Sequence, residues 1–417
     1  FKEGKSSIIG EKVKDRKTYI KGRCHMKNKE LLLVPGPTPV IDEIYDALAN
    51  ETRGHTDPRF VAIYKNAIEQ TKQLLQTDGE VFIVAGSGTL AMEMAIVNTI
   101  GKGERLLVIS HGYFGDRFKP LAKAYGIEVD VLQAEWGKQV DPLLVEETLT
   151  QKEYKAVTIT HADTSTGVLS DLDILVPLIK KTGALVILDG VVATAALDEN
   201  MSKSYGGNAE YKIDIVLTGS QKAIGIPPGL AIIAFNQTAL KARDALGEVA
   251  AYYCDIKNWI PIMQDPSKYF ATPPVNLIYA YQKAMDIVLE EGIKQREQRH
   301  IAFGRGIRAA LRTFGMKPLA NEEVSAPTLS CILYPEGVDD VAFRTLLSHK
   351  GIIVAGALAH LAGKAFRIGH MGNTTAEMLE QAIRSVGEVL HELGVEVNQE
   401  LALQSFKEEL LLIGQTH

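Results

Sequence analysis

Short runs of branched apolar residues alternate along this chain with longer segments whose apolar positions recur at helical spacing. Such runs are typical of buried strands, and the longer segments are typical of amphipathic helices. Strands are predicted at 81–85, 105–110, 128–132, 156–160, 185–189, 215–218 and 230–235, and helices at 58–77, 88–100, 115–126, 142–150 and 171–182. This alternation predicts an α/β fold with a mostly parallel sheet between helices, whose ligands collect at the carboxyl ends of the strands.

The pattern changes after Pro273-Pro274. One long helical stretch is predicted at 275–313, followed by strands at 329–333, 352–354 and 365–368 and helices at 339–350 and 375–394. We therefore expect a smaller α+β domain that is hinged through the long helix. The predicted division is a large domain at 41–290, a small C-terminal domain at 291–417, and a segment at 26–40 that packs with the small domain.

Residues 1–25 carry eight Lys or Arg against three acidic residues and lack the apolar stretch of a signal peptide. We interpret them as a leader or a segment added by cloning, with a basic interaction tail as the alternative. The whole chain has a formal net charge of -6, which gives no basic field for nucleic acid or an anionic membrane. Its apolar runs are far shorter than the roughly 18 residues that cross a bilayer, so we expect no membrane partner.

The three cysteines are Cys24, Cys254 and Cys331, an odd number at wide separations. They form neither a disulfide framework nor the paired spacing of a zinc site, so no metal is expected. A reducing compartment is the default for such a chain, and we predict a cytoplasmic location.

The turn Gly86-Ser-Gly-Thr89 joins a predicted strand to a predicted helix. Glycines allow backbone N–H groups to approach an anion at the helix N-terminus, and Ser87 and Thr89 add hydroxyl donors. The turn lacks the spacing of a nucleoside-triphosphate or dinucleotide loop. It is therefore either a phosphate site or a plain strand-to-helix turn that is capped by a serine.

Two further strands end in charged side chains, one in Asp189 and the other shortly before Lys222. Alone, the aspartate could be a turn cap, and the lysine could extend to water. Both are expected at the same sheet edge as the phosphate turn, and that convergence favours a shared site. A lysine that attacks a carbonyl and an acid that keeps a ring nitrogen protonated are the two groups that a pyridoxal phosphate enzyme requires.

With these residues in place, the chain resembles the class V aminotransferases of the fold type I pyridoxal phosphate superfamily, most of all the alanine–glyoxylate and serine–glyoxylate (serine–pyruvate) group. The resemblance covers Leu31 to about Leu393. It is carried by Pro35-Gly-Pro37, Arg53-Gly-His55, Gly86-Ser-Gly88, Gly112-Tyr-Phe-Gly115, Thr160-His-Ala-Asp-Thr-Ser-Thr-Gly167, Leu188-Asp189, Gly219-Ser-Gln-Lys222, Pro227-Pro-Gly229, Tyr269-x-x-Thr272 and Phe366-Arg-Ile-Gly369. This ordered set is specific for the superfamily and much less specific for the substrate.

The resemblance implies a role for each residue near the cofactor ring. Lys222 is expected to carry the cofactor as a Schiff base and then to act as the base that moves a proton. Asp189 is expected to pair with the ring nitrogen. Phe114, where other members place a tryptophan, and Val191 are expected on opposite faces of the ring, and the Thr164 hydroxyl is expected near O3′.

The resemblance also implies a phosphate site shared between two subunits of a homodimer. The residues expected there are Ser87, Gly88, Thr89 and Gln221 from one subunit, and Tyr269 and Thr272 from the other. Relatives often have histidine in place of Thr89, so this position departs from the family pattern. Arg367 is expected to bind the substrate α-carboxylate with its planar guanidinium, with a surface salt bridge as the alternative. His55 receives no role.

The resulting hypothesis is a transamination in two half-reactions. A small amino acid such as alanine or serine gives its amine to the cofactor, and a 2-oxo acid such as glyoxylate or pyruvate collects it. One alternative is a cysteine desulfurase or lyase, but Gln221 stands where desulfurases have histidine, and Cys331 lies in a predicted strand. The other is an aminotransferase-like subunit without catalysis, although none of Lys222, Asp189 and Arg367 is lost.

Overall fold

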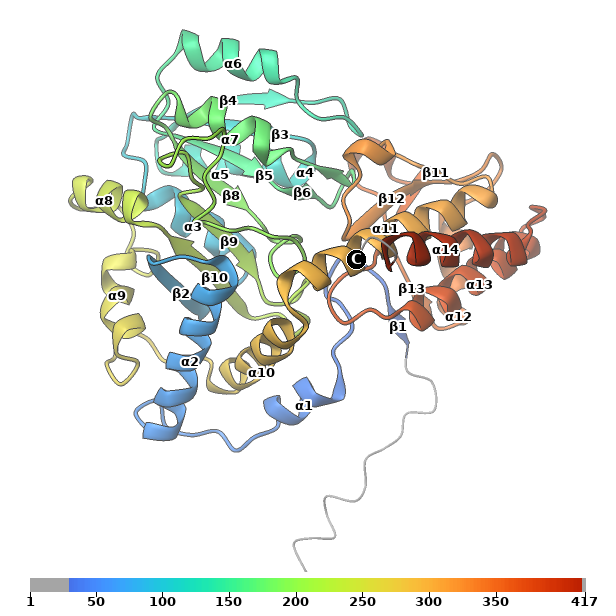
Figure 1. Ribbon diagram of the computed structural model, residues 1–417, viewed down its shortest axis with the longest axis horizontal. Coiled ribbons are helices and arrows are strands. Elements are labelled where there is room, and N and C mark those ends of the chain that lie inside the picture. Colours follow the sequence, from blue (N-terminus) through green and yellow to red (C-terminus); the bar gives the residue numbers. More distant parts are fainter. Residues whose placement is uncertain (1–29, 415–417) are drawn as a thin grey trace, which may run out of the picture.

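A computed structural model describes residues 30–414 of the chain (Figure 1). The predicted leader at 1–25 and the first residues of the predicted segment at 26–40 lie outside the described residues. None of the helices between residues 30 and 414 combines the length and the apolar character that a membrane span requires.

The large sheet has seven strands in the order β2-β10-β9-β8-β5-β3-β4. Their bounds are β2 Glu80–Ala85, β3 Arg105–Ser110, β4 Glu128–Gln133, β5 Ala156–Thr160, β8 Leu185–Asp189, β9 Ile215–Gly219 and β10 Leu230–Phe235. The strand β10 lies between β2 and β9 and runs antiparallel to both, whereas the other neighbouring strands of this sheet are parallel. The α/β class and the mostly parallel sheet are therefore confirmed.

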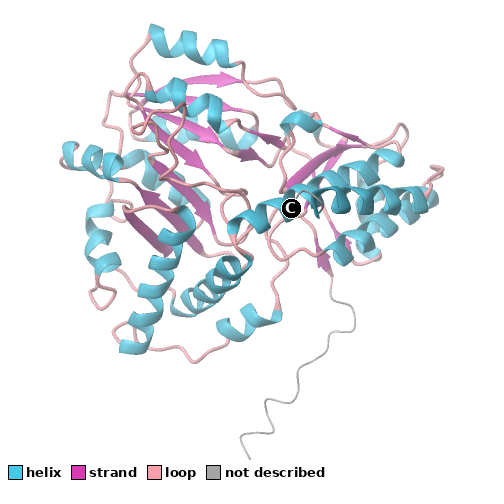
Figure 2. Cartoon of the chain, in the orientation of Figure 1, coloured by secondary structure: helices cyan, strands magenta, loops and turns pink. Residues whose placement is uncertain are grey.

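Helices pack around this sheet, as the colouring by secondary structure shows (Figure 2). They are α1 Asp42–Leu48, α2 Pro58–Leu75, α3 Gly88–Val97, α4 Tyr113–Asp116, α5 Phe118–Ala124, α6 Pro142–Gln151, α7 Leu172–Lys180, α8 Gln237–Ala245 and α9 Ile256–Gln264. Two residues explain why α2 begins where it does. Pro58 has no N–H to leave unpaired, and the Asp57 carboxylate accepts the N–H of Arg59. Asp141 and Pro142 begin α6 in the same way.

A second sheet has four antiparallel strands in the order β11-β12-β15-β14. Their bounds are β11 Lys317–Pro318, β12 Leu329–Leu333, β14 Ala355–Gly356 and β15 Ala365–Gly369. The helices beside it are α11 Ile293–Thr313, α12 Asp340–His349, α13 Ala376–Glu392 and α14 Gln399–Gly414. The N-terminal strand β1 (Leu31–Leu32) pairs in parallel with β13 (Ile352–Ile353), so the start of the described chain lies beside its C-terminal part.

The single long helix predicted at 275–313 is wrong. Two helices, α10 (Val275–Glu291) and α11, meet at Gly292, whose φ of 79° and ψ of 139° cannot continue a helix. Glycine adopts a positive φ at little cost, which is why the chain turns at this residue. Apolar side chains on the two sides of the break belong to different cores: one runs from Ile44 to Val288, and the other joins Leu33 to residues between Phe303 and Phe406.

Candidate active site

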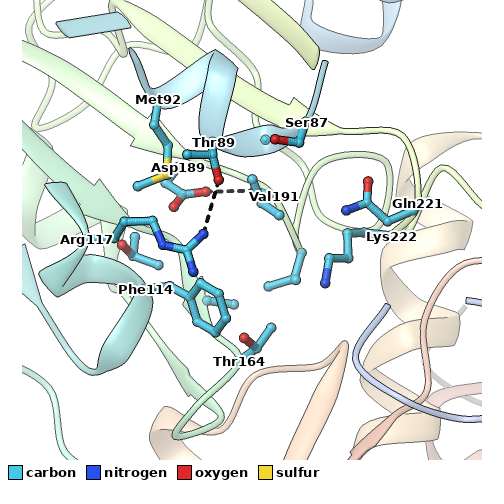
Figure 3. A pocket seen from close by; sticks show the side chains of 14 residues that line it. Ser87, Thr89, Met92, Phe114, Arg117, Thr164, Asp189, Val191, Gln221 and Lys222 are labelled. Carbon is cyan, nitrogen blue, oxygen red and sulfur yellow. Dashed lines mark hydrogen bonds between the residues drawn. The ribbon is translucent and has the colours of Figure 1, made fainter. Parts of the chain in front are cut away.

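A pocket of about 120 Å³ lies at the carboxyl ends of β2, β5, β8 and β9 (Figure 3). Nine of the residues predicted from the sequence line it: Ser87, Gly88, Thr89, Phe114, Thr164, Asp189, Val191, Gln221 and Lys222. It is also lined by residues that the sequence analysis did not single out, namely Met92, Arg117, Thr160, Ala162 and Val192. Figure 3 shows Lys222 and Gln221 on one side of the pocket and Asp189 on the other.

The phosphate turn forms the N-terminus of α3. Ser87 is the N-cap residue, yet its hydroxyl makes no capping hydrogen bond. A Cβ atom at Gly88 would lie 2.9 Å from a methyl carbon of Val191, so only glycine allows the turn to approach this wall of the pocket. The first N–H groups of α3 and the free Ser87 hydroxyl thus make a site suited to an anion.

Asp189 ends β8, and its side chain is almost completely buried. Burial raises the pKa of Asp189 to about 7, although the N–H of Val191 donates a hydrogen bond to Oδ1 at 3.0 Å. A buried carboxylate of this kind is stabilised in its ionised form by a cation beside it. The protonated nitrogen of a heterocycle in the pocket would be such a cation.

Lys222 lies in the turn that follows β9. Burial, followed by the charge of Arg367, lowers the pKa of Lys222 to about 8. Thr38 holds the turn from the N-terminal segment: its N–H donates to the Gln221 carbonyl at 3.1 Å and its hydroxyl to the Lys222 carbonyl at 2.8 Å. The lowered pKa gives a useful fraction of neutral amine near physiological pH, which a nucleophile or base requires.

The Pro35-Gly-Pro37 motif, which the sequence analysis left without a function, lies directly on this lysine. Lys222 Nζ donates a hydrogen bond to the Pro35 carbonyl at 2.5 Å. Gly36 has a φ of +92°, and a Cβ atom there would lie 2.6 Å from Lys222 Nζ. Glycine is therefore required both by the backbone and by the space that the lysine occupies.

Phe114 lies in the short helix α4 and faces the pocket, and Val191 lines another wall. The guanidinium of Arg117 lies 4.9 Å from the centroid of the Phe114 ring and donates a hydrogen bond to the Thr89 hydroxyl at 3.2 Å. The sequence analysis missed Arg117. Its position three residues after Phe114 was the available signal, because residues at that spacing share one face of a helix.

Arg367 lies on β15, outside the set of lining residues but close enough for its charge to lower the pKa of Lys222. Its Nε donates to the Gly356 carbonyl at 2.9 Å, and burial lowers the pKa of Arg367 itself. Cys331 is paired with Arg367 across β12 and β15. Burial raises the pKa of Cys331 to about 12, so the thiol stays protonated and lacks the reactivity that a desulfurase nucleophile needs.

Tyr269 and Thr272 do not line this pocket. Both lie in the loop between α9 and α10, where the Tyr269 hydroxyl is 3.4 Å from the Thr272 hydroxyl. Tyr269 is 63% exposed, and its ring centroid is 5.2 Å from that of His55. The structure therefore leaves the two predicted phosphate ligands at the surface of their own subunit.

The polar atoms of the pocket fit a phosphorylated pyridine aldehyde. Among residues 30–414, Gln221 Oε1 and Thr160 Oγ1 are buried without a hydrogen-bond partner. The two ends of an amide exchange by rotation, so Gln221 can present its NH₂ group to a phosphate at the α3 N-terminus. Asp189 supplies the acceptor for a ring nitrogen, and Lys222 supplies the amine for an aldehyde. Pyridoxal phosphate carries these three groups.

Residues 37–386 match the family described as aminotransferase class-V. The chain is 38% identical over 385 residues to an uncharacterized aminotransferase of Methanocaldococcus jannaschii, covering 90% of this chain and 98% of that relative. It is 32% identical to the serine–glyoxylate aminotransferase of Methylorubrum extorquens, covering 88% of this chain and 92% of the relative. The solved alanine–glyoxylate aminotransferase of Nostoc sp. superimposes with a TM-score of 0.80 at 29% identity, covering 87% of this chain and 95% of that one.

The family match spans most of the chain, and its relatives match along nearly their whole length. Class V aminotransferases depend on pyridoxal phosphate, and the pocket holds the amine, acid and anion turn that this cofactor needs. The chain therefore belongs to the class V aminotransferase family and is a pyridoxal phosphate-dependent transaminase of fold type I.

Proposed function

We propose that this transaminase moves an amino group from alanine or serine to glyoxylate or pyruvate by a ping-pong mechanism. The observation that carries the proposal is the convergence of Lys222, Asp189 and the α3 N-terminus on one pocket, with Arg367 within electrostatic range of the lysine. Relatives named as serine–glyoxylate and alanine–glyoxylate aminotransferases support these substrates.

Pyridoxal phosphate, when bound, accepts the amino group and withdraws electrons from the substrate Cα. Lys222 would carry the cofactor between turnovers and, once released, move a proton between the substrate Cα and the cofactor C4′. Its pKa of about 8 supports this role, because a base whose pKa lies near the working pH both takes and returns a proton readily.

The other proposed contacts with the cofactor ring come from residues that line the pocket. Asp189 would hold the ring nitrogen protonated, since burial makes an unpaired carboxylate costly at this position. Phe114 and Val191 would lie against the two ring faces, and the Thr164 hydroxyl would bind O3′. These four side chains all line the pocket, which supports this arrangement.

For the phosphate, we propose Ser87, Gly88, Thr89 and Gln221 from the same subunit. Tyr269 and Thr272 would reach the phosphate of the partner in a homodimer. Tyr269 is exposed and does not line the pocket of its own subunit, which supports a contribution across the interface.

Arg367 would bind the substrate α-carboxylate and so orient the Cα bond that breaks. Burial lowers its pKa, which favours an anion as its partner.

We also propose that the two domains meet near Gly292, where the two apolar cores separate. The buried free thiols of Cys254 and Cys331 support a reducing, cytoplasmic location.

A screen of half-reactions tests the substrates. The cofactor-loaded protein is mixed with one amino acid at a time, and the absorption band of the bound cofactor is followed. The proposal expects alanine and serine to react fastest and glyoxylate to restore the starting spectrum. Preference for bulky aromatic donors would contradict the substrates while leaving the transaminase class in place.

A further inference from the structure

Asp163 is a buried carboxylate beside the pocket to which the proposed function gives no task. It ends the short strand β6 (Ala162–Asp163), one residue before Thr164, and its side chain has no exposed surface. Among residues 30–414, no Lys, Arg or His lies within ion-pair distance of it. A buried carboxylate is costly unless hydrogen bonds satisfy it, so its partners define its role.

All of these partners belong to the turn that carries Phe114 or to the loop that carries Thr164. Asp163 Oδ2 accepts the N–H groups of Phe114 and Gly115, both at 3.1 Å. Oδ1 accepts the N–H of Ser165 at 2.8 Å and its hydroxyl at 2.6 Å. The Ser165 oxygen in turn accepts the N–H of Tyr113 at 2.9 Å, which ties the turn and the loop together a second time.

Close approach between the turn and the carboxylate depends on Gly112. A Cβ atom at this position would lie 3.0 Å from Asp163 Cγ, which would force the turn and the loop apart. This contact links two of the sequence motifs, Gly112-Tyr-Phe-Gly115 and Thr160 to Gly167. The two motifs therefore meet in one hydrogen-bonded unit with Asp163 at its centre.

We infer that Asp163 is a positioning residue of the cofactor site, which fixes the Phe114 ring and the Thr164 hydroxyl relative to each other. This inference rests on the proposed roles of Phe114 and Thr164. The carboxylate anchors the backbone of Phe114 and the loop of Thr164, two residues that line the pocket, so the ring face and the O3′ side would be set by one group.

The negative charge of Asp163, considered without its hydrogen bonds, would weaken cofactor binding. Its negative charge raises the pKa of Asp189, and this opposes the ionised state that pairs with a ring nitrogen. Removal of that charge without any change in geometry would therefore improve cofactor binding. If an uncharged variant of Asp163 binds the cofactor less tightly, the loss is therefore due to the changed positions of Phe114 and Thr164.

The test is Asp163→Asn, which keeps the shape but places an NH₂ group against N–H donors. Asp214→Asn is the control for the loss of a buried carboxylate: Asp214 is also buried, accepts the N–H of Val186 at 2.8 Å and pairs with Lys180 at 2.7 Å, but it lies before β9 and does not line the pocket. The affinity of each cofactor-free protein for pyridoxal phosphate is measured by titration, and the circular dichroism of the cofactor band reports the orientation of the bound ring.

We expect Asp163→Asn to weaken cofactor binding on the order of tenfold and to change the circular dichroism of the cofactor band, whereas Asp214→Asn leaves both as in wild type. Ser165→Ala, which removes one link and is less disruptive, should shift both readouts in the same direction by a smaller amount. Unchanged or tighter binding by the Asp163 variant, or an equal loss in both Asn variants, would overturn the inference. If the wild-type protein itself failed to bind the cofactor, the proposed function would fall instead.

Discussion

Pro35 and Lys222 are joined by a 2.5 Å hydrogen bond from Nζ to the Pro35 carbonyl, across 187 residues of sequence. Two residues before Pro35, the carbonyl of Leu33 accepts the N–H of Gly369, which ends the strand of Arg367. Three residues after Pro35, Thr38 bonds to the backbone of Gln221 and Lys222. The N-terminal segment thus ties the lysine to the strand of the proposed substrate arginine.

Gly36→Ala should displace the lysine and lower kcat by about 10²-fold, since a displacement of about 1 Å at a reacting group has a cost of that size. The added Cβ would lie 2.6 Å from Lys222 Nζ, at a φ of +92°. Gly103→Ala is the control, because Gly103 has a φ of +83° and no atom within 4 Å of a new Cβ. Steady-state kinetics that show equal losses in both variants would mean that backbone strain, and not the lysine, is responsible.

Cofactor attachment should become faster with pH and level off above about pH 8. Only the neutral amine attacks an aldehyde, and burial lowers the pKa of Lys222 to about 8. Because the charge of Arg367 contributes to this shift, Arg367→Ala should move the midpoint to higher pH. Stopped-flow absorbance of the cofactor-free protein mixed with pyridoxal phosphate measures both; a rate that keeps rising to the pKa of an exposed lysine would contradict the assignment.

Most of the fold could be predicted from the sequence, because buried strands leave a local signal. β12 was predicted at 329–333 and lies at Leu329–Leu333, and β5 and β8 are equally close. The pairing of β1 with β13 has no such signal, since two residues become a strand only through a distant partner. Gly292 was overlooked for the opposite reason: the apolar period continues through it, while its positive φ ends the helix.

The residues of the site also differ in whether the local sequence predicts them. Asp189, Lys222 and the phosphate turn end predicted strands, so topology alone brings them to one edge of the sheet. Arg117 was missed although it stands only three residues after Phe114, whose ring it contacts. Asp163 was missed because its partners are far away in the sequence: its carboxylate meets the N–H of Phe114 across 49 residues. Such a contact leaves no periodic pattern that could be read in advance.

Arg367→Ala should raise the KM for alanine on the order of 100-fold with a smaller effect on kcat. A bidentate, charge-assisted pair with the α-carboxylate is worth roughly 3 kcal/mol, and it forms before the chemical step. Arg384→Ala is the control, because Arg384 is about half exposed and makes only a 4.0 Å ion pair with Glu380. An unchanged KM in the Arg367 variant would show that another group binds the carboxylate.

Two inactive variants should restore activity when they share a dimer. In a mixed dimer of Lys222→Ala with Tyr269→Phe/Thr272→Val, one of the two sites has all of its residues if Tyr269 and Thr272 act across the interface. Random exchange of subunits would then return about one quarter of wild-type activity. Activity is measured after co-expression of differently tagged subunits; the absence of restored activity in purified mixed dimers would place both residues in their own subunit's site.

The central claim, that Lys222 carries the cofactor, is tested most directly by borohydride reduction of the loaded protein followed by mass mapping of its peptides. The account predicts the reduced cofactor on Lys222 alone. It also predicts that Lys222→Ala keeps the wild-type far-ultraviolet circular dichroism but loses the label and at least about 10³-fold in turnover. A label on another lysine, or a Lys222→Ala protein that turns over at the wild-type rate, would contradict it.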